Sequence, residues 1–204
     1  MRSGAEGGRL VLASASASRI AMLRQAGLTV AQEPAGVDED AVKRSLRAEG
    51  ADADHVAITL ADLKAQQVSR RRPEAFVIGA DQMLDCSGVW FDKPPDIDHA
   101  RAHLLSLRGR KHELITAAVV VRGGARIWHH VERATLTMRP LSDAFIDQYL
   151  RDVGTEVCGT VGAYRLEGLG AQLFSRVDGD FFTILGLPLL PLLDFLRGRG
   201  IVAE

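Results

Sequence analysis

The sequence predicts an α/β fold, and three observations support this prediction. Short apolar runs rich in β-branched residues alternate along the chain with segments whose apolar residues recur at helical spacing. Turns that contain glycine or proline separate these segments, and no internal repeat interrupts their order. With 204 residues, of which 47% are hydrophobic, the chain is long enough to bury a sizeable core.

The first strand and helix follow an N-terminal tail. Residues 1–8 contain one arginine and three glycines without an apolar stretch, so we expect a disordered tail and no secretory signal. Residues 9–204 are expected to form a single domain. It begins with a short strand at Leu10–Ala13, and a helix then starts within Ser14–Arg19. Gly27 is placed to end this helix.

An acidic run and a long helix come next. Asp38–Asp40 follows a turn region, and such a run of acids is usually a solvated loop. A helix is expected from about residue 54 to residue 70, with Lys64 beside its inner face, where a lysine is more often a surface residue than a ligand. The residues expected on the inner face are Val56, Leu60 and Leu63.

The next strand contains the first candidate catalytic residue. The run Val77–Asp81 is apolar and β-branched and ends with a carboxylate. A turn at Ser87–Gly88 leads into Val89–Phe91, which suggests a hairpin that returns Lys93 toward Asp81. A carboxylate at a sheet edge with a lysine nearby suits a metal-phosphate site. The simpler interpretation is that Asp81 only caps a turn.

The remaining segments continue the alternation of helices and strands. The expected elements are a helix over 96–107, a basic turn over 108–112, a β-hairpin of 113–122 with 127–138, a helix over 142–150, a glycine-rich loop over 159–170, a strand over 172–177 and a closing helix from 188. The apolar stretch from Ile184 to Leu196 is read as a buried helix, because spanning a bilayer needs about 20 apolar residues.

Charge and cysteine content exclude several classes of partner. The formal net charge is -1, whereas nucleic acids and anionic membranes require a basic surplus on the protein. We therefore expect neither a nucleic-acid partner nor a membrane partner. The two cysteines, Cys86 and Cys158, lack the paired spacing of a zinc site and indicate a reduced, cytoplasmic chain with free thiols.

A second phosphate signal lies at the first junction between a strand and a helix. Serines at positions 14, 16 and 18 place hydroxyl groups near a helix N-terminus, whose backbone N–H groups attract phosphate. Arg19 adds a fixed positive charge in the first turn. An ordinary serine N-cap explains the same residues without any ligand.

Short motifs follow one another in a specific order over about residues 9–196. They are Leu12-Ala13-Ser14-Ala15-Ser16, Asp38-Glu39, Lys64-Ala65, Gly79-Ala80-Asp81, Lys93-Pro94, Gly109-Arg110-x-His112 with Thr116, Gly162-Ala163-Tyr164 and Gly186-Leu187-Pro188. In this order and spacing the chain resembles the Maf family of nucleoside triphosphate pyrophosphatases. The resemblance implies an elongated, two-lobed, inosine triphosphatase-like α/β fold, with a mixed β-sheet flanked by helices and a deep central cleft.

The resemblance also implies a reaction and its residues. The reaction is hydrolysis between the α and β phosphates of a nucleoside triphosphate, with Mg²⁺ or Mn²⁺ as cofactor, and Asp81 is the implied proton acceptor. A triphosphate needs cations for its oxygens, and the metal needs carboxylates, so the residue types agree with this chemistry. The implied catalytic residues are Asp81, Glu39, Lys64 and Lys93; the substrate-binding residues are Ser14, Ser16, Arg19, Arg110, His112, Thr116 and Tyr164; the metal ligands are Asp38, Glu39 and Asp81.

Base specificity in this family is tuned at three positions, which here are Ser18, Gln82 and Glu167. The branch that acts on dTTP and UTP carries Arg, Thr and Gln, and the 7-methyl-GTP branch carries Trp, Gln and Glu. This chain matches the second branch at two positions, and a carboxylate suits the adjacent N–H donors of guanine. Ala17 in place of the usual proline, Ser18 itself and Gly159 depart from the family pattern.

We therefore expect a pyrophosphatase of a modified or noncanonical nucleotide, with a guanine type such as 7-methyl-GTP favoured. A dTTP/UTP pyrophosphatase is the alternative within the family. A non-catalytic, nucleotide-responsive regulator of cell division and a simple nucleotide-binding module are alternatives of other classes, but an intact set of carboxylates and lysines has little use in a purely structural protein. The sequence leaves a homodimer open.

Overall fold

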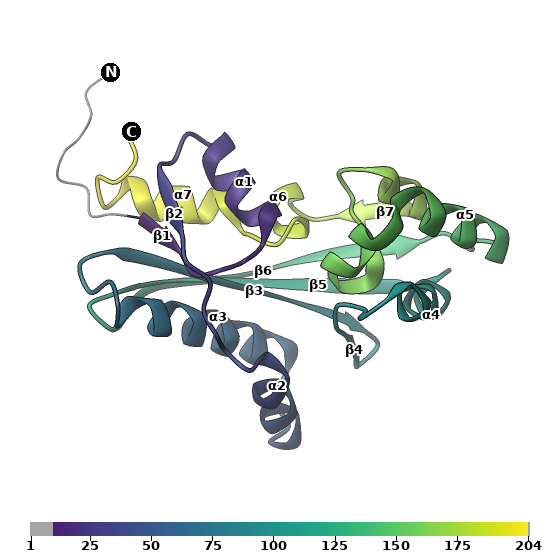
Figure 1. Ribbon diagram of the computed structural model, residues 1–204, viewed down its shortest axis with the longest axis horizontal. Helices are drawn as coiled ribbons and strands as arrows, with labels where there is room; N and C mark the ends of the chain where they lie inside the picture. Colours follow the sequence, from purple (N-terminus) through teal and green to yellow (C-terminus); the bar gives the residue numbers. More distant parts are fainter. Residues whose placement is uncertain (1–9, 204) are drawn as a thin grey trace. The chain divides into compact units, whose positions relative to one another are not determined.

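The computed structural model describes residues 10–203 and has the mixed α/β architecture that the sequence predicts (Figure 1). The expected tail, residues 1–8, lies outside the described residues. The strands are β1 (Leu10–Leu12), β2 (Val30–Gln32), β3 (Phe76–Cys86), β4 (Val89–Phe91), β5 (Lys111–Arg122), β6 (Ala125–Met138) and β7 (Phe174–Asp178). The helices are α1 (Ala17–Gln25), α2 (Glu39–Ala48), α3 (Ala53–Ser69), α4 (Ile97–Leu107), α5 (Asp143–Val153), α6 (Phe181–Ile184) and α7 (Leu189–Arg197).

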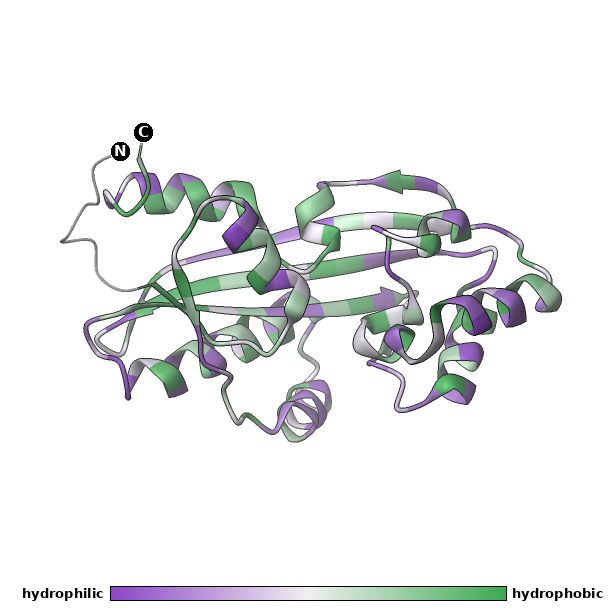
Figure 2. Cartoon of the chain, turned by 45° about the horizontal axis from the view of Figure 1, so that its top comes forward, coloured by the Kyte–Doolittle hydropathy of each residue, from purple (hydrophilic) through white to green (hydrophobic). Residues whose placement is uncertain are grey.

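The strands form one mixed sheet. Its order is β2-β1-β3-β5-β6-β7, and β4 pairs with β3 away from this path. β1 runs parallel to β2 and β3, whereas the β3–β4 and β6–β7 pairs are antiparallel. β1 and β5 are buried over nearly their whole length, which explains why they read as continuous apolar runs rather than as alternating ones. Figure 2 shows hydrophobic colours along parts of the long strands, with hydrophilic residues between them.

The chain divides into two compact units. The first contains Met1–Asp81, Thr116–Glu132 and Gly186–Glu204, and the second contains Gln82–Ile115 and Arg133–Leu185. β3, β5 and β6 contribute residues to both units. That residues 9–204 behave as one domain stays a prediction.

In the first unit, helices cover both faces of the strands. α1 and α7 lie over one face and α3 lies along the other (Figure 1). α3 presents small residues to the sheet, and Ala57, Ala61 and Ala65 are fully buried. A Cβ atom on Gly79 of β3 would lie 2.0 Å from the carbonyl oxygen of Ala61 and 2.9 Å from the Cβ of Ala65. The glycine therefore allows α3 to approach β3 more closely than any side chain at that position would permit.

The second unit has its own apolar core. α4 and α5 pack together, and buried side chains of β3, β5 and β6 join them. Three 3₁₀ segments, Gly154–Gly159, Val161–Ala163 and Leu169–Leu173, occupy half of the region expected to be a loop. Both cysteines are free, as predicted.

Several elements agree with the sequence-based predictions. The hairpin of β5 and β6 turns at Gly123 and Gly124, whose positive φ angles of 57° and 77° favour glycine. The hairpin of β3 and β4 turns at Ser87–Gly88, with Leu84 opposite Phe91. Ser142 is the N-cap of α5, since its side chain accepts a hydrogen bond from the Phe145 N–H.

Two predictions about the first unit's elements are wrong. The expected solvated loop at Asp38–Asp40 is the start of helix α2, because the Asp38 side chain caps it by accepting a hydrogen bond from the Ala41 N–H at 2.9 Å. Leu63 was expected on the inner face of α3, but it is 39% exposed, because the face against the sheet is formed by the neighbouring alanines together with Val56 and Leu60.

Three further predictions are also wrong. The strand expected to end at Asp81 continues to Cys86, since its second half pairs with β4. His112, expected in a basic turn, is a buried residue of β5. The apolar stretch from Ile184 to Leu196 is not one buried helix, because α6 ends at Ile184 and α7 begins at Leu189. Within residues 10–203 no helix has both the length and the apolar character needed to cross a bilayer.

Candidate active site

Asp81, Lys64 and Glu39 form the centre of the candidate site in the first unit. The Lys64 ammonium group donates to Oδ1 of Asp81 at 2.6 Å and lies 2.7 Å from Oε1 of Glu39. Lys64 and Asp81 are buried, whereas the side chain of Glu39 is 44% exposed. One buried cation therefore links a buried carboxylate to one that solvent reaches. The structure thus brings together three of the four predicted catalytic residues.

One oxygen of the Asp81 carboxylate, Oδ2, has no hydrogen-bond partner among the described residues. This oxygen is also buried. A buried carboxylate oxygen without a donor is costly unless another group completes it. Because Asp81 lies within β3 rather than at its end, strand pairing fixes the position of its backbone. The arrangement suits an acceptor for a proton or for a cation.

The predicted metal ligands are only partly brought together. Asp38 is engaged as the N-cap of α2, and within residues 10–203 no group of three or more His, Cys, Asp and Glu side chains is arranged to hold a metal ion. Glu39 and Asp81 remain as a pair around Lys64. Mg²⁺ is commonly bound by one or two carboxylates, with water and substrate phosphates completing its shell. The unpartnered Oδ2 of Asp81 and the accessible Glu39 fit a cation held in that way.

Arg19 anchors the segment beside Asp81. Its Nε donates to the Gly186 carbonyl at 2.6 Å, and its Nη1 donates to the Ala80 carbonyl at 3.0 Å and to Oγ of Ser14 at 3.3 Å. Burial lowers the pKa of the Arg19 guanidinium, and the charges of Asp81 and Glu39 oppose this shift. The arginine expected to bind phosphate thus also ties α1 to the residue that precedes Asp81.

The serines around α1 have local structural partners. Ser16 is the N-cap of α1, since its Oγ accepts from the Arg19 N–H at 3.3 Å. The Ser16 N–H donates to Oγ of Ser14 at 3.2 Å. Ser18 is half-buried in the first turn of α1, and Thr116 is buried in β5. The N-cap interpretation and a phosphate site at the same helix end are compatible, because capping leaves other N–H groups of the first turn without intrahelical partners.

In the second unit, His112 and Tyr164 form a buried pair. Nε2 of His112 lies 2.8 Å from the Tyr164 hydroxyl, and Phe174 packs against both rings. His112 is 1% exposed, and its burial lowers its pKa to about 4. Burial also raises the pKa of the Tyr164 hydroxyl. At neutral pH both groups are uncharged, so they hold the Gly162–Tyr164 segment against the core and offer no cation to a phosphate.

This burial predicts a dependence of stability on pH. The folded protein keeps His112 neutral down to about pH 4, whereas the unfolded chain protonates it near pH 6.5, so stability present at neutral pH is lost as the pH falls. Between pH 7 and pH 5 the loss due to His112 is expected to be about 2 kcal/mol. Glutamine does not titrate, so His112→Gln should lose about 2 kcal/mol less of its free energy of unfolding between pH 7 and pH 5 than wild type does. Urea unfolding at the two pH values measures both losses.

A matched control separates this effect from general acid sensitivity. His55 is exposed on α3, so His55→Gln should retain the steeper, wild-type pH dependence. Equal pH dependence in wild type and His112→Gln would contradict the assignment of this loss to His112.

The predicted specificity residues of the second unit have protein partners. Nε2 of Gln82 donates to the carbonyls of Thr183 and Ile184 at 3.0 and 3.1 Å. Oε1 of Glu167 accepts from Nε of Arg165 at 3.1 Å, a partner that the sequence-based prediction missed. The signal available for it was a pair of opposite charges two residues apart. Lys93, a predicted catalytic residue, and Arg110, a predicted substrate-binding residue, are exposed residues of the same unit.

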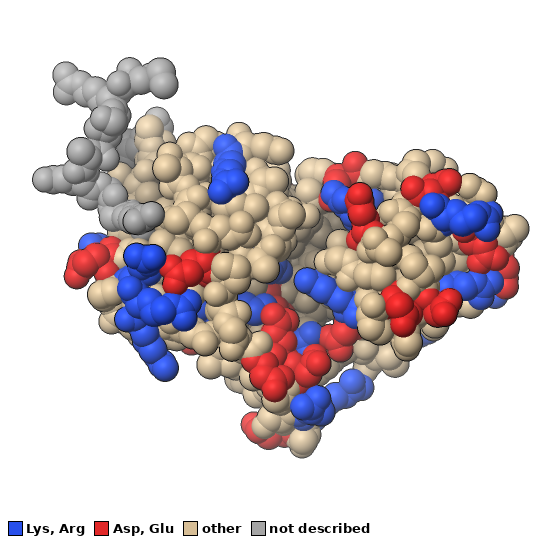
Figure 3. All heavy atoms as spheres, viewed as in Figure 1, with Lys and Arg blue, Asp and Glu red and all other residues tan. Residues whose placement is uncertain are grey.

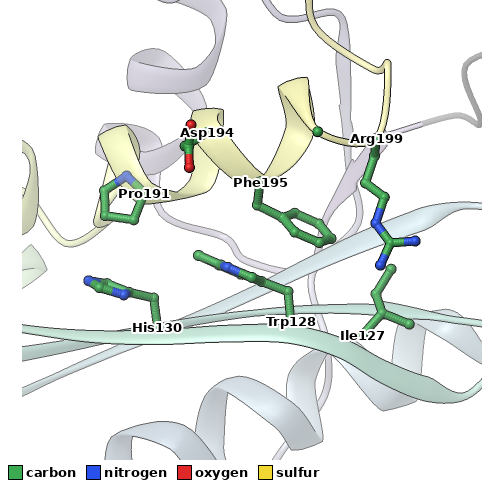
Figure 4. Close-up of a pocket in the computed structure, with 8 residues that line it drawn as sticks. Ile127, Trp128, His130, Pro191, Asp194, Phe195 and Arg199 are labelled. Carbon is green, nitrogen blue, oxygen red and sulfur yellow. The ribbon is translucent and has the colours of Figure 1, made fainter.

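A surface pocket of about 610 Å³ lies elsewhere in the first unit (Figure 4). Trp128 and His130 of β6 point toward α7, where Phe195 stacks on Trp128 with ring centroids 5.3 Å apart. No predicted site residue lines this pocket, so it is separate from the candidate active site. Its lining residues are Ile127, Trp128, His130, Pro191, Asp194, Phe195, Gly198 and Arg199.

Basic and acidic side chains form ion pairs on the surface of the described residues. On the face displayed in Figure 3, basic and acidic side chains both occur, in small groups of each sign. Arg71 and Arg72, for example, both pair with Glu33. The expected absence of a nucleic-acid partner stays a prediction.

Comparison with known proteins shows the family. The model of the Maf-like protein family matches residues 9–199. A nucleoside triphosphate pyrophosphatase of Granulibacter bethesdensis is 57% identical over 189 residues, which cover 93% of this chain and 96% of that protein. One of Paramagnetospirillum magneticum is 58% identical, covering 93% of this chain and 98% of that protein. A 7-methyl-GTP pyrophosphatase of Mesorhizobium japonicum is 50% identical, covering 95% and 98%. The resemblance inferred from the motifs is therefore confirmed, and the chain belongs to the family of Maf-like proteins.

Proposed function

We propose that this protein hydrolyses a nucleoside triphosphate between its α and β phosphates, and that it prefers a guanine nucleotide such as 7-methyl-GTP. The observation that carries the reaction is the buried Lys64 held between Asp81 and Glu39, with Oδ2 of Asp81 unpartnered. The names of the similar proteins support the reaction class, because they are pyrophosphatases of nucleoside triphosphates.

In the proposed reaction Asp81 is the general base. Oδ1 is held by the Lys64 ammonium group, so the unpartnered Oδ2 is the oxygen that accepts a proton from an attacking water. Lys64 fixes the carboxylate in one orientation and prevents it from turning its second oxygen away. Removal of that proton generates the nucleophile for attack on phosphorus.

Glu39 and Asp81 are the residues that would hold a divalent cation. Bound there, Mg²⁺ or Mn²⁺ supplies charge neutralisation for the phosphate oxygens and lowers the pKa of a coordinated water. The exposed side of Glu39 gives such a cation access from solvent. Lys64 limits the net negative charge of the carboxylate pair, which a dense anion would otherwise meet.

Glu167 is the basis of the proposed guanine preference. Its carboxylate offers only acceptors, whereas guanine presents N1–H and an exocyclic amine side by side. Uracil and thymine place carbonyl oxygens on both sides of a single N–H, and a carboxylate would face those oxygens unfavourably. The 7-methyl-GTP pyrophosphatase among the similar proteins supports the same preference.

The experiment is pyrophosphate release from GTP, 7-methyl-GTP, dTTP, UTP and ATP by the purified protein with Mg²⁺ or Mn²⁺. We expect turnover that requires the metal and is fastest for a guanine nucleotide. Faster turnover of dTTP and UTP would support the alternative specificity and remove Glu167 from base recognition. No turnover of any nucleotide would overturn the proposed reaction and favour a binding or regulatory role.

A further inference from the structure

We propose that Arg165 is a specificity-determining residue, which orients the Glu167 carboxylate for the guanine base and thereby controls which nucleotide the enzyme prefers. This inference rests on the proposed function, because it assigns a role to a residue that contacts the proposed base-recognition group. Arg165 belongs to none of the predicted catalytic, metal or substrate-binding sets.

The first observation is the pair of contacts that Arg165 makes. Its Nε donates to Oε1 of Glu167 at 3.1 Å, and its Nη1 donates to Oε2 of Glu156. The guanidinium is planar and rigid, so contacts at two of its nitrogens fix its plane. Glu156 thus holds the arginine, and the arginine holds Glu167.

The second observation is that the backbone around Glu167 is fixed as well. The Gly168 N–H donates to the Arg165 carbonyl at 3.3 Å, which closes a turn with Glu167 inside it. A Cβ atom on Gly170 would lie 2.3 Å from the same carbonyl oxygen, so the following chain packs closely on the turn. Just before the turn, the Tyr164 carbonyl accepts from Oγ1 of Thr160 at 2.8 Å. The turn therefore fixes the backbone of Arg165, the residue whose side chain pairs with Glu167.

The third observation is that the pairing leaves Glu167 able to accept further hydrogen bonds. The two oxygens of a carboxylate together accept about four hydrogen bonds, and Arg165 uses one of them on Oε1. The side chain of Glu167 is 27% exposed, so a ligand can reach it. Both guanine donors can bind while Arg165 stays in place.

The proposed pairing affects the entropy that the Glu167 side chain loses when a guanine base binds. A glutamate that moves freely loses rotamer entropy when it binds a base, and holding it in place beforehand removes that loss. The gain applies only to a base that uses the carboxylate, so it changes selectivity between bases rather than the rate of bond cleavage. Arg165 should therefore affect KM for guanine nucleotides and leave kcat unchanged.

The test is steady-state kinetics of Arg165→Gln with GTP, 7-methyl-GTP and UTP. We expect KM for both guanine nucleotides to rise roughly tenfold, with kcat retained and with KM for UTP unchanged. Arg165→Lys keeps the charge but lacks the two-nitrogen fork, and it should lower the guanine preference in the same direction. The same change in Glu167→Gln protein should have no further effect, since Arg165 acts through that carboxylate.

The matched control is Arg176→Gln. Arg176 also pairs through its Nε with an acid two residues on, Asp178, at 2.6 Å in the same unit. Its loss should leave the ratio of guanine to uracil kcat/KM unchanged.

Three results would overturn the assignment of Arg165. They are an equal loss for all nucleotides, an unchanged preference in both Arg165 variants, and the same loss with and without Glu167. These results differ from a failure of the proposed function. Wild-type protein that hydrolyses nucleotides without a guanine preference removes the Arg165 and Glu167 assignments and keeps the reaction, whereas wild-type protein that hydrolyses none removes the reaction as well.

Discussion

Asp81→Asn is expected to lower turnover of the preferred nucleotide at least ~100-fold, the usual scale of a lost general base. Asparagine has nearly the same shape, and its amide oxygen can still accept from Lys64, whose ammonium group keeps Glu39 as a partner at 2.7 Å. The folded structure should therefore persist while the proton acceptor is lost. Pyrophosphate release measured at saturating nucleotide and metal checks the rate, and thermal unfolding checks the fold.

Asp85→Asn is the matched control for this variant. Asp85 lies four residues further along β3, and its Oδ1 accepts from the Gly88 N–H in the hairpin turn, a role that asparagine can take over. Its turnover should equal that of wild type. If Asp81→Asn also turned over nucleotide at the wild-type rate, Asp81 could not be the base.

Lys64→Met is expected to have the largest effect on stability. The substitution keeps most of the apolar stem but leaves the buried Asp81 carboxylate without its cation. Removing one partner of a buried ion pair typically lowers the free energy of unfolding by about 3–5 kcal/mol. Glu39 contributes less to this loss, because its side chain is 44% exposed and water can replace the lysine. Urea unfolding at pH 7 measures the change.

The double variant Lys64→Met, Asp81→Asn tests the reason for the loss. With the buried charge removed as well, much of the lost stability should return, so the double variant should be more stable than Lys64→Met alone. The opposite result would be that the losses in the free energy of unfolding of the two single variants simply add in the double variant. In that case the unpaired carboxylate is not the cause of the loss in Lys64→Met. Circular dichroism of each variant confirms that the fold is retained.

The fold class and most elements were predictable, because alternating apolar patterns, turn glycines and N-cap residues are local signals. α2 was not, since the run Asp38–Asp40 is equally typical of a loop and of a capped helix start. The extent of β3 was missed because Asp81 is a buried charge within a strand, which only its tertiary partner Lys64 makes tolerable.

The candidate site was predictable to the same degree. Residue types and motif order predicted Asp81, Lys64 and Glu39, and the structure brings them together. The states of other residues depend on burial, which a sequence does not state directly. His112 is an example, because its neutrality follows from its surroundings in β5 rather than from its basic neighbours in the sequence. Arg165 was missed because a pair of charges two residues apart is usually only a surface feature.

The close approach of α3 to β3 at Gly79 determines when the Lys64–Asp81 pair is assembled. A lysine on an exposed helix samples many rotamers, and a ligand that needs one of them must select it at each encounter. Lys64 is buried between the helix and the strand, so its conformational freedom is lost once, when the chain folds, and not again each time a ligand binds. The absence of a Cβ atom at Gly79 thus lets the packing of the protein interior set the distance between Lys64 and Asp81.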